Sequence, residues 1–188
     1  MKLLPNNENY KRAIQYDLEF NKAFRGGSLS KDFLRSDNWR FICLYRKFQV
    51  NQDNVWGKYY KKKLKKAEVK TGFSFEENLS IGKGLIIGHK GTIVINGQAH
   101  FGDQMFITHN VTVGRDIRGK RAGVPTFGNR VCIRTNSTVV GNIHIGNDVL
   151  IAPNTFVNFD VPDHSVVIGN PATIHHRDNA TEGHIPEI

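Results

Sequence analysis

Apolar residues recur along this chain with two different periods, and the change of period falls near residue 72. Between residues 8 and about 68, aromatic and aliphatic residues alternate with charged ones at helical spacing, as in YKRAIQYDLEFNKAF and DNWRFICLYRKF. The glycine pair of RGGS, at residues 25–28, interrupts this pattern. The sequence therefore predicts a helical N-terminal region over residues 1–71.

From residue 72 onward, lysine becomes rare and apolar residues recur every six positions. Ten residues keep this spacing in two series: Ile95, Phe101, Ile107, Val113, and then Phe127, Ile133, Val139, Ile145, Ile151 and Val157. Apolar or small residues also stand four places after most of them: Ala99, Met105, Val111, Val131, Ser137, Ile143, Val149 and Thr155. The step of 14 residues from Val113 to Phe127 marks an insertion.

A six-residue unit with two inward side chains cannot bury its apolar face alone, so it must stack on copies of itself. Ordinary antiparallel strands would instead show two-residue alternation and Asn-Gly hairpins, of which Asn96-Gly97 is the one instance. The sequence thus predicts a mainly β protein, with a parallel β-helix over 72–177, a loop insertion at 115–125 and a tail at 178–188.

The formal net charge of +9 is concentrated in one segment, Lys58 to Lys70, which holds seven lysines and one glutamate. Such a segment is either a solvated helix face or a surface for an anionic substrate, an anionic membrane or nucleic acid. No helix-turn-helix, RNA-binding or zinc-finger pattern accompanies the charge, so we expect no nucleic-acid partner. Weak association with a membrane surface is the functional alternative.

The two cysteines, Cys43 and Cys132, are 89 positions apart, which suggests neither a C-x-x-C metal site nor a disulfide framework. A reducing compartment is the simpler expectation. The N-terminal segment lacks a signal-peptide pattern, and no stretch approaches the length of a membrane span. We therefore expect a soluble, cytoplasmic protein.

The stretch GLIIGHKGTIVING places one imidazole, His89, between two apolar runs flanked by glycines. A histidine in such a setting is either a hydrogen-bonded structural residue or a group that titrates near ambient pH for catalysis. The residues around it leave both interpretations open.

The segment IGKGLIIGHKGTIVINGQAHFGDQMFITHNVTVG, the array after it and the closing VIGNPATI resemble the serine acetyltransferase-like branch of the hexapeptide-repeat acyltransferases. Within it the chain looks closest to bacterial polysaccharide O-acetyltransferases. The resemblance covers residues 81–177. It implies a left-handed β-helix with three hexads per turn, a homotrimer, and acetyl-CoA bound between neighbouring subunits. It also gives His89 the place of the catalytic general base, which deprotonates the acceptor hydroxyl.

Two departures from that family bear on the acceptor. Serine acetyltransferases carry an aspartate before the catalytic histidine that helps to hold the serine ammonium, and this chain has Gly88. Their Arg-His pair before the proline, whose arginine binds the serine carboxylate, is replaced by Gly123-Val124. A site without these partners loses its selectivity for a charged substrate.

In place of a glutamine, this chain has His109, which could orient a sugar hydroxyl or contact a neighbouring subunit. We therefore expect transfer of acetyl to a sugar or polysaccharide hydroxyl of the bacterial surface, with His89 and His109 in catalysis. The alternative is serine O-acetyltransferase. The terminal residue, Ile188, is the one feature that favours it. An inactive binding trimer is the non-enzyme alternative.

The resemblance also suggests binding residues. For acetyl-CoA we expect Gly114, Arg115, Thr135, Pro153, Thr173 and Arg177, with Arg177 compensating for Thr173 where the family has a cation. For the acceptor we expect Asn96, Asn110, Arg118, Lys120 and Arg121, the last three in a loop that is either a flap over the ligands or simply solvated. The spacing of His89, His100 and His109 differs from that of the β-helix carbonic anhydrases, so we expect no metal.

Overall fold

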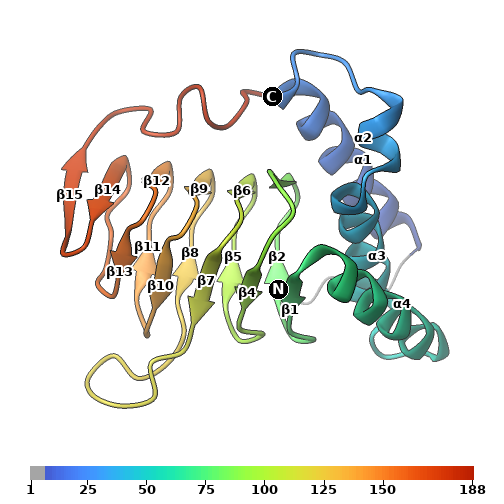
Figure 1. Cartoon of the computed structure of the whole chain (residues 1–188), viewed down its shortest axis with the longest axis horizontal. Coiled ribbons are helices and arrows are strands. Elements are labelled where there is room, and N and C mark those ends of the chain that lie inside the picture. The colour runs from blue at the N-terminus through green and yellow to red at the C-terminus, as the bar shows by residue number, and fades with distance from the viewer. Residues whose placement is uncertain (1–6) are drawn as a thin grey trace.

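The computed structural model describes residues 7–188, in which four helices precede a solenoid of fifteen short strands (Figure 1). The first six residues of the N-terminal segment examined for a signal peptide lie outside this range. The helices are α1 (Asn7–Phe24), α2 (Lys31–Arg35), α3 (Asp37–Asn51) and α4 (Val55–Thr71). The last helix ends just before the first strand, near the change of period in the sequence.

Local side chains determine where the helices begin and end. The hydroxyls of Ser30 and Ser36 accept hydrogen bonds from the third backbone N–H after each of them, and Asn54 accepts one from the N–H of Trp56. Helix α4 is capped at its C-terminal end by Gly72, whose φ of 81° lies in the left-handed region. Caps at both ends therefore define the lysine-rich helix.

The strands form three sheets along the sides of a solenoid of about five turns. Sheet A contains β1 (Phe73–Phe75), β4 (Ile93–Ile95), β7 (Val111–Gly114), β10 (Thr138–Val140) and β13 (Phe156–Val157). Sheet B contains β2 (Ser80–Ile81), β5 (His100–Phe101), β8 (Thr126–Phe127) and β11 (His144–Ile145). Sheet C contains β3 (Leu85–Ile87), β6 (Met105–Ile107), β9 (Val131–Ile133), β12 (Val149–Ile151), β14 (Ser165–Gly169) and β15 (Ala172–His176). All neighbours pair in parallel except β14 and β15, which are antiparallel.

The hexad positions fill the inside of the solenoid. All ten residues at six-residue spacing are buried, and so are the eight residues that stand four places after members of the series. Phe101 and Phe127 stack with their ring centroids 4.3 Å apart, on adjacent turns. The internal repeat of the sequence is therefore the repeat of the core.

A column of Asp and Asn side chains stabilises the corner that precedes sheet C. The carboxylate of Asp103 accepts a hydrogen bond from the backbone N–H of Lys83 on the previous turn, and Asn129, Asn147 and Asp163 repeat the contact on later turns. Glycine precedes the column because the turns approach closely here: a Cβ at Gly128 would lie 2.8 Å from Oδ1 of Asn147.

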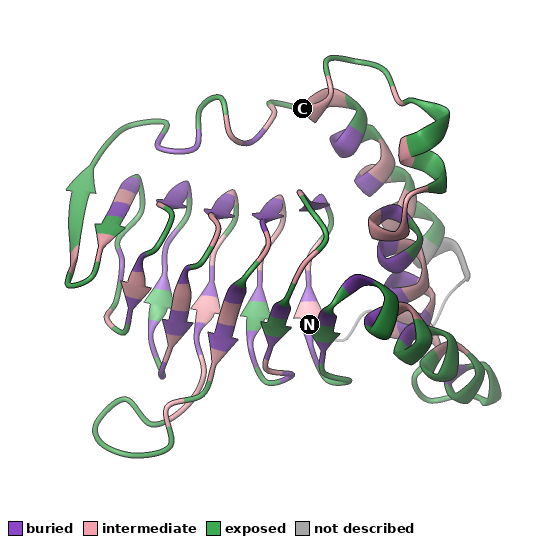
Figure 2. Ribbon diagram, in the orientation of Figure 1, coloured by how far each residue is buried: buried purple, intermediate pink, exposed green. Residues whose placement is uncertain are grey.

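From β3 to β12 the outer face of sheet C is apolar and covered, and Figure 2 shows these strands as buried. Ile86, Phe106, Cys132 and Leu150 point out of the solenoid and pack against Phe20 of α1 and Ile185 of the tail, which runs back toward α1 (Figure 1). Cys132 is thus buried under this layer, and burial raises the pKa of its thiol to about 12.

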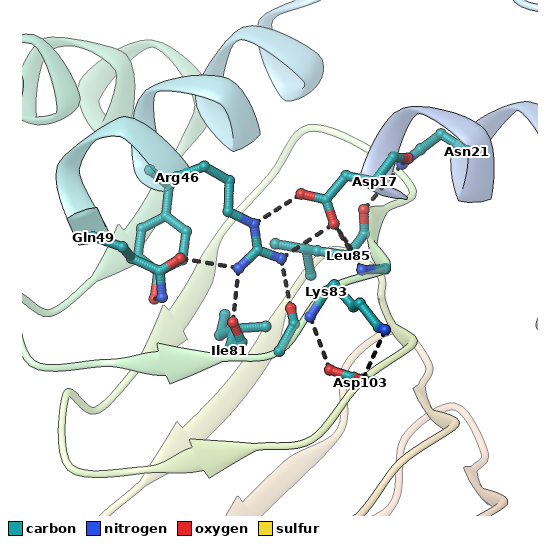
Figure 3. A network of polar contacts seen from close by, with 11 residues as sticks. Asp17, Asn21, Arg46, Gln49, Ile81, Lys83, Leu85 and Asp103 are labelled. Carbon is teal, nitrogen blue, oxygen red and sulfur yellow. Dashed lines mark hydrogen bonds and ion pairs between the residues drawn. The ribbon is translucent and has the colours of Figure 1, made fainter. Parts of the chain in front are cut away.

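A buried ion pair between Asp17 of α1 and Arg46 of α3 ties both helices to the first turn of the solenoid (Figure 3). The Asp17 carboxylate lies 2.8 Å from Nε of Arg46 and also accepts the backbone N–H groups of Gly84 and Leu85, at 2.7 and 2.9 Å. Arg46 in turn donates to the carbonyl of Ile81 at 2.7 Å. None of the described helices has the length and apolar character of a membrane span.

Candidate active site

The corner where the chain passes from sheet C to sheet A, called here the C–A corner, carries both histidines predicted to act in catalysis. His89, His109, Thr135 and Pro153 each stand two residues after the last residue of a sheet C strand. Those last residues, Ile87, Ile107, Ile133 and Ile151, pair with one another in register. The four side chains therefore form a column on successive turns, spaced about 4.8 Å apart.

The rings of His89 and His109 lie next to each other in this column, in an edge-to-face arrangement. Their centroids are 5.6 Å apart and their planes are inclined by 80°. The His89 ring is exposed, whereas His109 is half-buried and Asn110, beside it, is exposed. The structure thus brings together three residues that the sequence assigned to catalysis and acceptor binding.

Two buried polar atoms in the column have no hydrogen-bond partner among residues 7–188: Nδ1 of His109 and Oγ1 of Thr135. Leaving a buried donor or acceptor unpaired costs about 1–3 kcal/mol. The C–A corner thus holds polar groups that the described part of the chain does not satisfy.

Glycines make room beside the two histidines. A Cβ at Gly91, whose φ is 136°, would lie 2.9 Å from Cβ of His109. A Cβ at Gly88 would lie 3.0 Å from Cε2 of Phe106 and 3.2 Å from Cγ2 of Thr108. The place of an acidic side chain before the histidine is therefore crowded by Phe106, a residue that the sequence analysis did not single out.

Phe106 occupies the outward middle position of a sheet C strand, between the two core residues Met105 and Ile107. An aromatic residue at an outward position was the signal available in the sequence. The layer that covers Phe106 comes from Phe24 of α1, whose ring centroid is 4.9 Å away, so only the tertiary structure shows its role.

The residue after His89 is held by the helical region. Lys90 pairs with the carboxylate of Asp37 at the start of α3, and Lys70 lies 2.7 Å from the same carboxylate. Hydrogen bonds from Lys70 and Lys90 lower the pKa of Asp37 to about 2. The carboxylate therefore stays ionised and anchors the turn that carries His89.

The remaining acceptor residues lie at the other end of sheet A, at the corner that leads into sheet B, called here the A–B corner. Asn96 follows β4, and its Oδ1 accepts the N–H of Gln98 at 3.0 Å, which commits the side chain to a turn. Gly114, predicted to bind acetyl-CoA, is the last residue of β7, and Arg115 and the loop at 115–125 follow it. Within one chain, the structure does not bring these residues to His89.

The loop at 115–125 projects from the solenoid (Figure 1) and is fixed at its base. Asp116 and Gly123 exchange two backbone hydrogen bonds of 2.9 Å, and the N–H of Asn142 donates to the carbonyl of Arg121 at 2.8 Å. The side chains of Arg118, Lys120 and Arg121 are exposed. The loop thus presents cations on a hairpin-like support, away from the histidines of its own chain.

Two of the residues predicted to bind acetyl-CoA, Thr173 and Arg177, lie apart. Thr173 pairs with Ile168 near the start of β15, and its hydroxyl lies 3.0 Å from Nε2 of His175. Arg177 follows the far end of β15, where its N–H donates to the carbonyl of His164 at 2.8 Å. Four strand residues span about 13 Å, so the two do not lie side by side.

Within the described residues, no three His, Cys, Asp or Glu side chains gather in a way that could hold a metal ion. The chemistry available at the C–A corner is therefore that of its imidazoles, a hydroxyl and backbone groups.

No family model matches the chain, but curated proteins do. The chain is 37% identical over 102 residues to a serine acetyltransferase of Helicobacter pylori. The matched segment covers 54% of this chain and 60% of that protein. The chain is also 37% identical over 105 residues to serine acetyltransferase 4 of Arabidopsis thaliana, covering 55% of this chain and 29% of that one. The chain thus spans less than two thirds of the length of these relatives.

Solved structures of similar fold cover most of the chain. Serine acetyltransferase from Vibrio cholerae matches with a TM-score of 0.79 at 22% identity, over 94% of this chain and 70% of that one. The soybean serine acetyltransferase complexed with serine matches with a TM-score of 0.78 at 22% identity, over 90% and 70%. These matches confirm the predicted left-handed parallel β-helix.

The predicted closeness to polysaccharide O-acetyltransferases is not confirmed. The similar proteins named above are serine acetyltransferases, which support the broader resemblance to hexapeptide-repeat acyltransferases and favour the alternative acceptor over the main one. Nothing in the comparisons supports a role in capsule or other surface polysaccharide.

Proposed function

We propose that this protein is an O-acetyltransferase that uses acetyl-CoA, with His89 as the general base. The observation that carries the proposal is the exposed His89 ring beside His109, on a β-helix similar to those of serine acetyltransferases. An imidazole titrates near ambient pH, which suits it to accept and return a proton within one reaction cycle.

In the proposed reaction, His89 removes the proton of the acceptor hydroxyl while that oxygen attacks the thioester carbonyl of acetyl-CoA. Backbone N–H groups of the solenoid corners stabilise the negative charge on the carbonyl oxygen. The bond to sulfur then breaks, and the protonated His89 returns its proton to the departing thiolate. The products are the acetyl ester and CoA, with no covalent acetyl-enzyme.

L-serine is the acceptor that the comparisons favour, because the similar curated proteins carry that activity in their names. It is therefore our first candidate. Serine would place its hydroxyl near His89, and its charged groups would need partners from the C–A corner or from another subunit.

A sugar hydroxyl is the second candidate, and a specific observation favours it. Phe106 and Thr108 crowd the place before His89, and a Cβ at Gly123 would lie 2.8 Å from Cβ of Asn142. A side chain at either position would force neighbouring atoms to shift, so the charged groups of the serine acetyltransferase pattern do not fit here without rearrangement. An unpaired buried charge costs several kcal/mol, a penalty that a neutral hydroxyl avoids.

We further propose a homotrimer in which each active site uses two subunits. The histidines and the cationic loop occupy different corners of one chain, so a single chain leaves the predicted site incomplete. In a closed three-fold ring, each A–B corner can face the C–A corner of the next subunit. Acetyl-CoA would then lie between Thr135 and Pro153 of one subunit and Arg115 of the other.

The test is release of free CoA from acetyl-CoA by the purified protein, with L-serine, nucleotide sugars or oligosaccharides as acceptors. Turnover that disappears in His89→Ala would support the acetyltransferase, and the acceptor with the higher kcat/KM would choose between the candidates. Absence of His89-dependent turnover with every acceptor, in a folded protein, would overturn the proposal.

A further inference from the structure

Helix α4 buries only a narrow stripe and exposes the rest of its surface (Figure 2). Its buried residues are Gly57, Leu64, Glu68 and Thr71, which repeat at helical spacing and face the rest of the chain. Its seven lysines are all exposed, and its one glutamate is among the buried residues. The face that points away from the protein is therefore strongly cationic.

Four of the lysines have no carboxylate partner among residues 11–188, and three of these contact no aromatic ring either. Lys61, Lys65 and Lys70 each pair with an acidic side chain, and Lys63 lies 4.6 Å from the ring centroid of Tyr59. The other three, Lys58, Lys62 and Lys66, are spaced four apart, which places them on one side of the helix. Their charge remains available to a partner.

Large apolar side chains accompany these lysines on the outer face of α4. The exposed fractions are 83% for Val55, 57% for Trp56, 46% for Tyr59 and 89% for Val69. The rings of Trp56 and Tyr59 meet edge to face with centroids 6.0 Å apart. Tyr59 stands three residues before Lys62, and Val69 stands three residues after Lys66, so apolar and cationic groups share one surface.

We propose that this outer face of α4 binds the surface of an anionic lipid bilayer. Lysines attract anionic headgroups, while Trp, Tyr and Val side chains enter the boundary between headgroups and acyl chains. Tryptophan and tyrosine are the residues that favour this boundary. Both halves of the required chemistry are present on the same helix face.

Two other partners fit the surface less well. A second copy of the same face would bring two sets of unpaired lysines together, which is repulsive. A nucleic acid would use the lysines but leave Val55 and Val69 in water, since its backbone offers phosphate contacts and no apolar phase. The exposed apolar residues therefore favour the bilayer.

The first experiment measures co-sedimentation of the whole chain with vesicles of phosphatidylcholine, alone or mixed with phosphatidylglycerol. We expect binding to the mixed vesicles only. The variant Lys58→Glu/Lys62→Glu/Lys66→Glu should bind them roughly a hundredfold more weakly, given the usual contribution of each lysine near an anionic surface. The control Lys11→Glu/Lys31→Glu/Arg35→Glu has the same net charge change at exposed positions on α1 and α2, and should retain most of the binding.

A second readout separates a bilayer from other polyanions. The chain has two tryptophans, and Trp39 is only 8% exposed, so a shift of emission on binding reports on Trp56. We expect a blue shift with the mixed vesicles, quenching by brominated lipid, and loss of both in Trp56→Phe. The variants should unfold at the same temperature as the parent protein, because the exchanged side chains are exposed.

Equal vesicle binding by the two triple variants would overturn the proposal. So would unchanged Trp56 emission together with equally tight binding to duplex DNA, since the face would then attract any polyanion. Loss of binding in the α4 variant alone, with the Trp56 shift, supports it. The result does not depend on which acceptor is acetylated.

Discussion

The imidazole of His89 stands edge-on to the imidazole of His109, with 5.6 Å between their centroids. The two rings come from successive turns, because Ile87 and Ile107 pair in parallel register two residues before them. A rigid solenoid therefore fixes the separation of two titratable groups at an exposed corner. Any role for one ring must take account of the other.

Replacement of His89 by alanine should lower kcat by about 10²–10⁴-fold, the usual effect of losing a general base. The exposed ring supports no core packing, so the unfolding temperature should stay unchanged. Turnover is measured by CoA release, and folding by circular dichroism. Near-parental kcat in the variant would remove His89 from the catalytic role.

His109 is predicted to position the acceptor or the His89 ring. His109→Gln, which restores the residue usual in the resembling family, should lower kcat/KM for the true acceptor by about tenfold to a hundredfold, the worth of one or two hydrogen bonds. An unchanged value would leave His109 as a surface residue at a subunit contact.

The repeat of the sequence was enough to predict the solenoid, because each hexad position has the same inward environment and selects the same kind of residue. The repeat also singled out His89 as unusual, because a titratable ring between apolar runs departs from the pattern. The structural roles of Phe106 and Asp148 were not predicted, because both side chains point out of the solenoid. Their partners, Phe24 and Thr181, come from parts of the chain far away in the sequence.

The two-subunit site predicts complementation between inactive variants. His89→Ala and the loop variant Arg118→Ala/Lys120→Ala/Arg121→Ala should each lose activity. After mixed refolding in equal amounts, about a quarter of the sites of a closed trimer combine an intact histidine with an intact neighbouring loop. We therefore expect about a quarter of the parental activity. Recovery no greater than the sum of the separate variants would place each site within one chain.

The ion pair between Asp17 and Arg46 should dominate the docking of α1. Asp17→Ala leaves the buried Arg46 without its carboxylate and two backbone N–H groups without an acceptor, which should cost about 3–5 kcal/mol of unfolding free energy. Glu19→Ala, two residues further on, breaks an exposed 3.8 Å pair with Lys22 and should cost at most about 1 kcal/mol. Urea unfolding measures both, and equal losses would show that burial of the Asp17 pair adds nothing.

One carboxylate, Asp148, binds residues 180 and 181 of the C-terminal tail, and this contact should depend on pH. Its oxygens accept the hydroxyl of Thr181 and the backbone N–H groups of Thr181 and Ala180, at 2.6, 3.0 and 2.8 Å. Nδ1 of His164 lies 2.9 Å from the same carboxylate. Burial by itself raises the pKa of Asp148, but the hydrogen bonds from Thr181, His164 and Ala180 outweigh it and lower the pKa. The hydrogen bond to Asp148 raises the pKa of His164.

The two shifts act in opposite pH ranges. Because the pKa of Asp148 is lowered in the folded state, its stabilisation is present above the ordinary value of about 3.9 and disappears as the pH falls through the folded value. Because the pKa of His164 is raised in the folded state, the stabilisation from His164 is complete below about pH 6.5. It is lost as the pH rises through the folded pKa. The tail should therefore be held most firmly between about pH 4 and 6.5, which limited proteolysis of residues 178–188 can measure.

His164→Gln should remove the loss of protection above that range and leave the loss at acidic pH. Asp148→Asn should expose the tail at every pH, and protection by Asp148→Asn equal to that of the parent would contradict the anchoring role of the carboxylate.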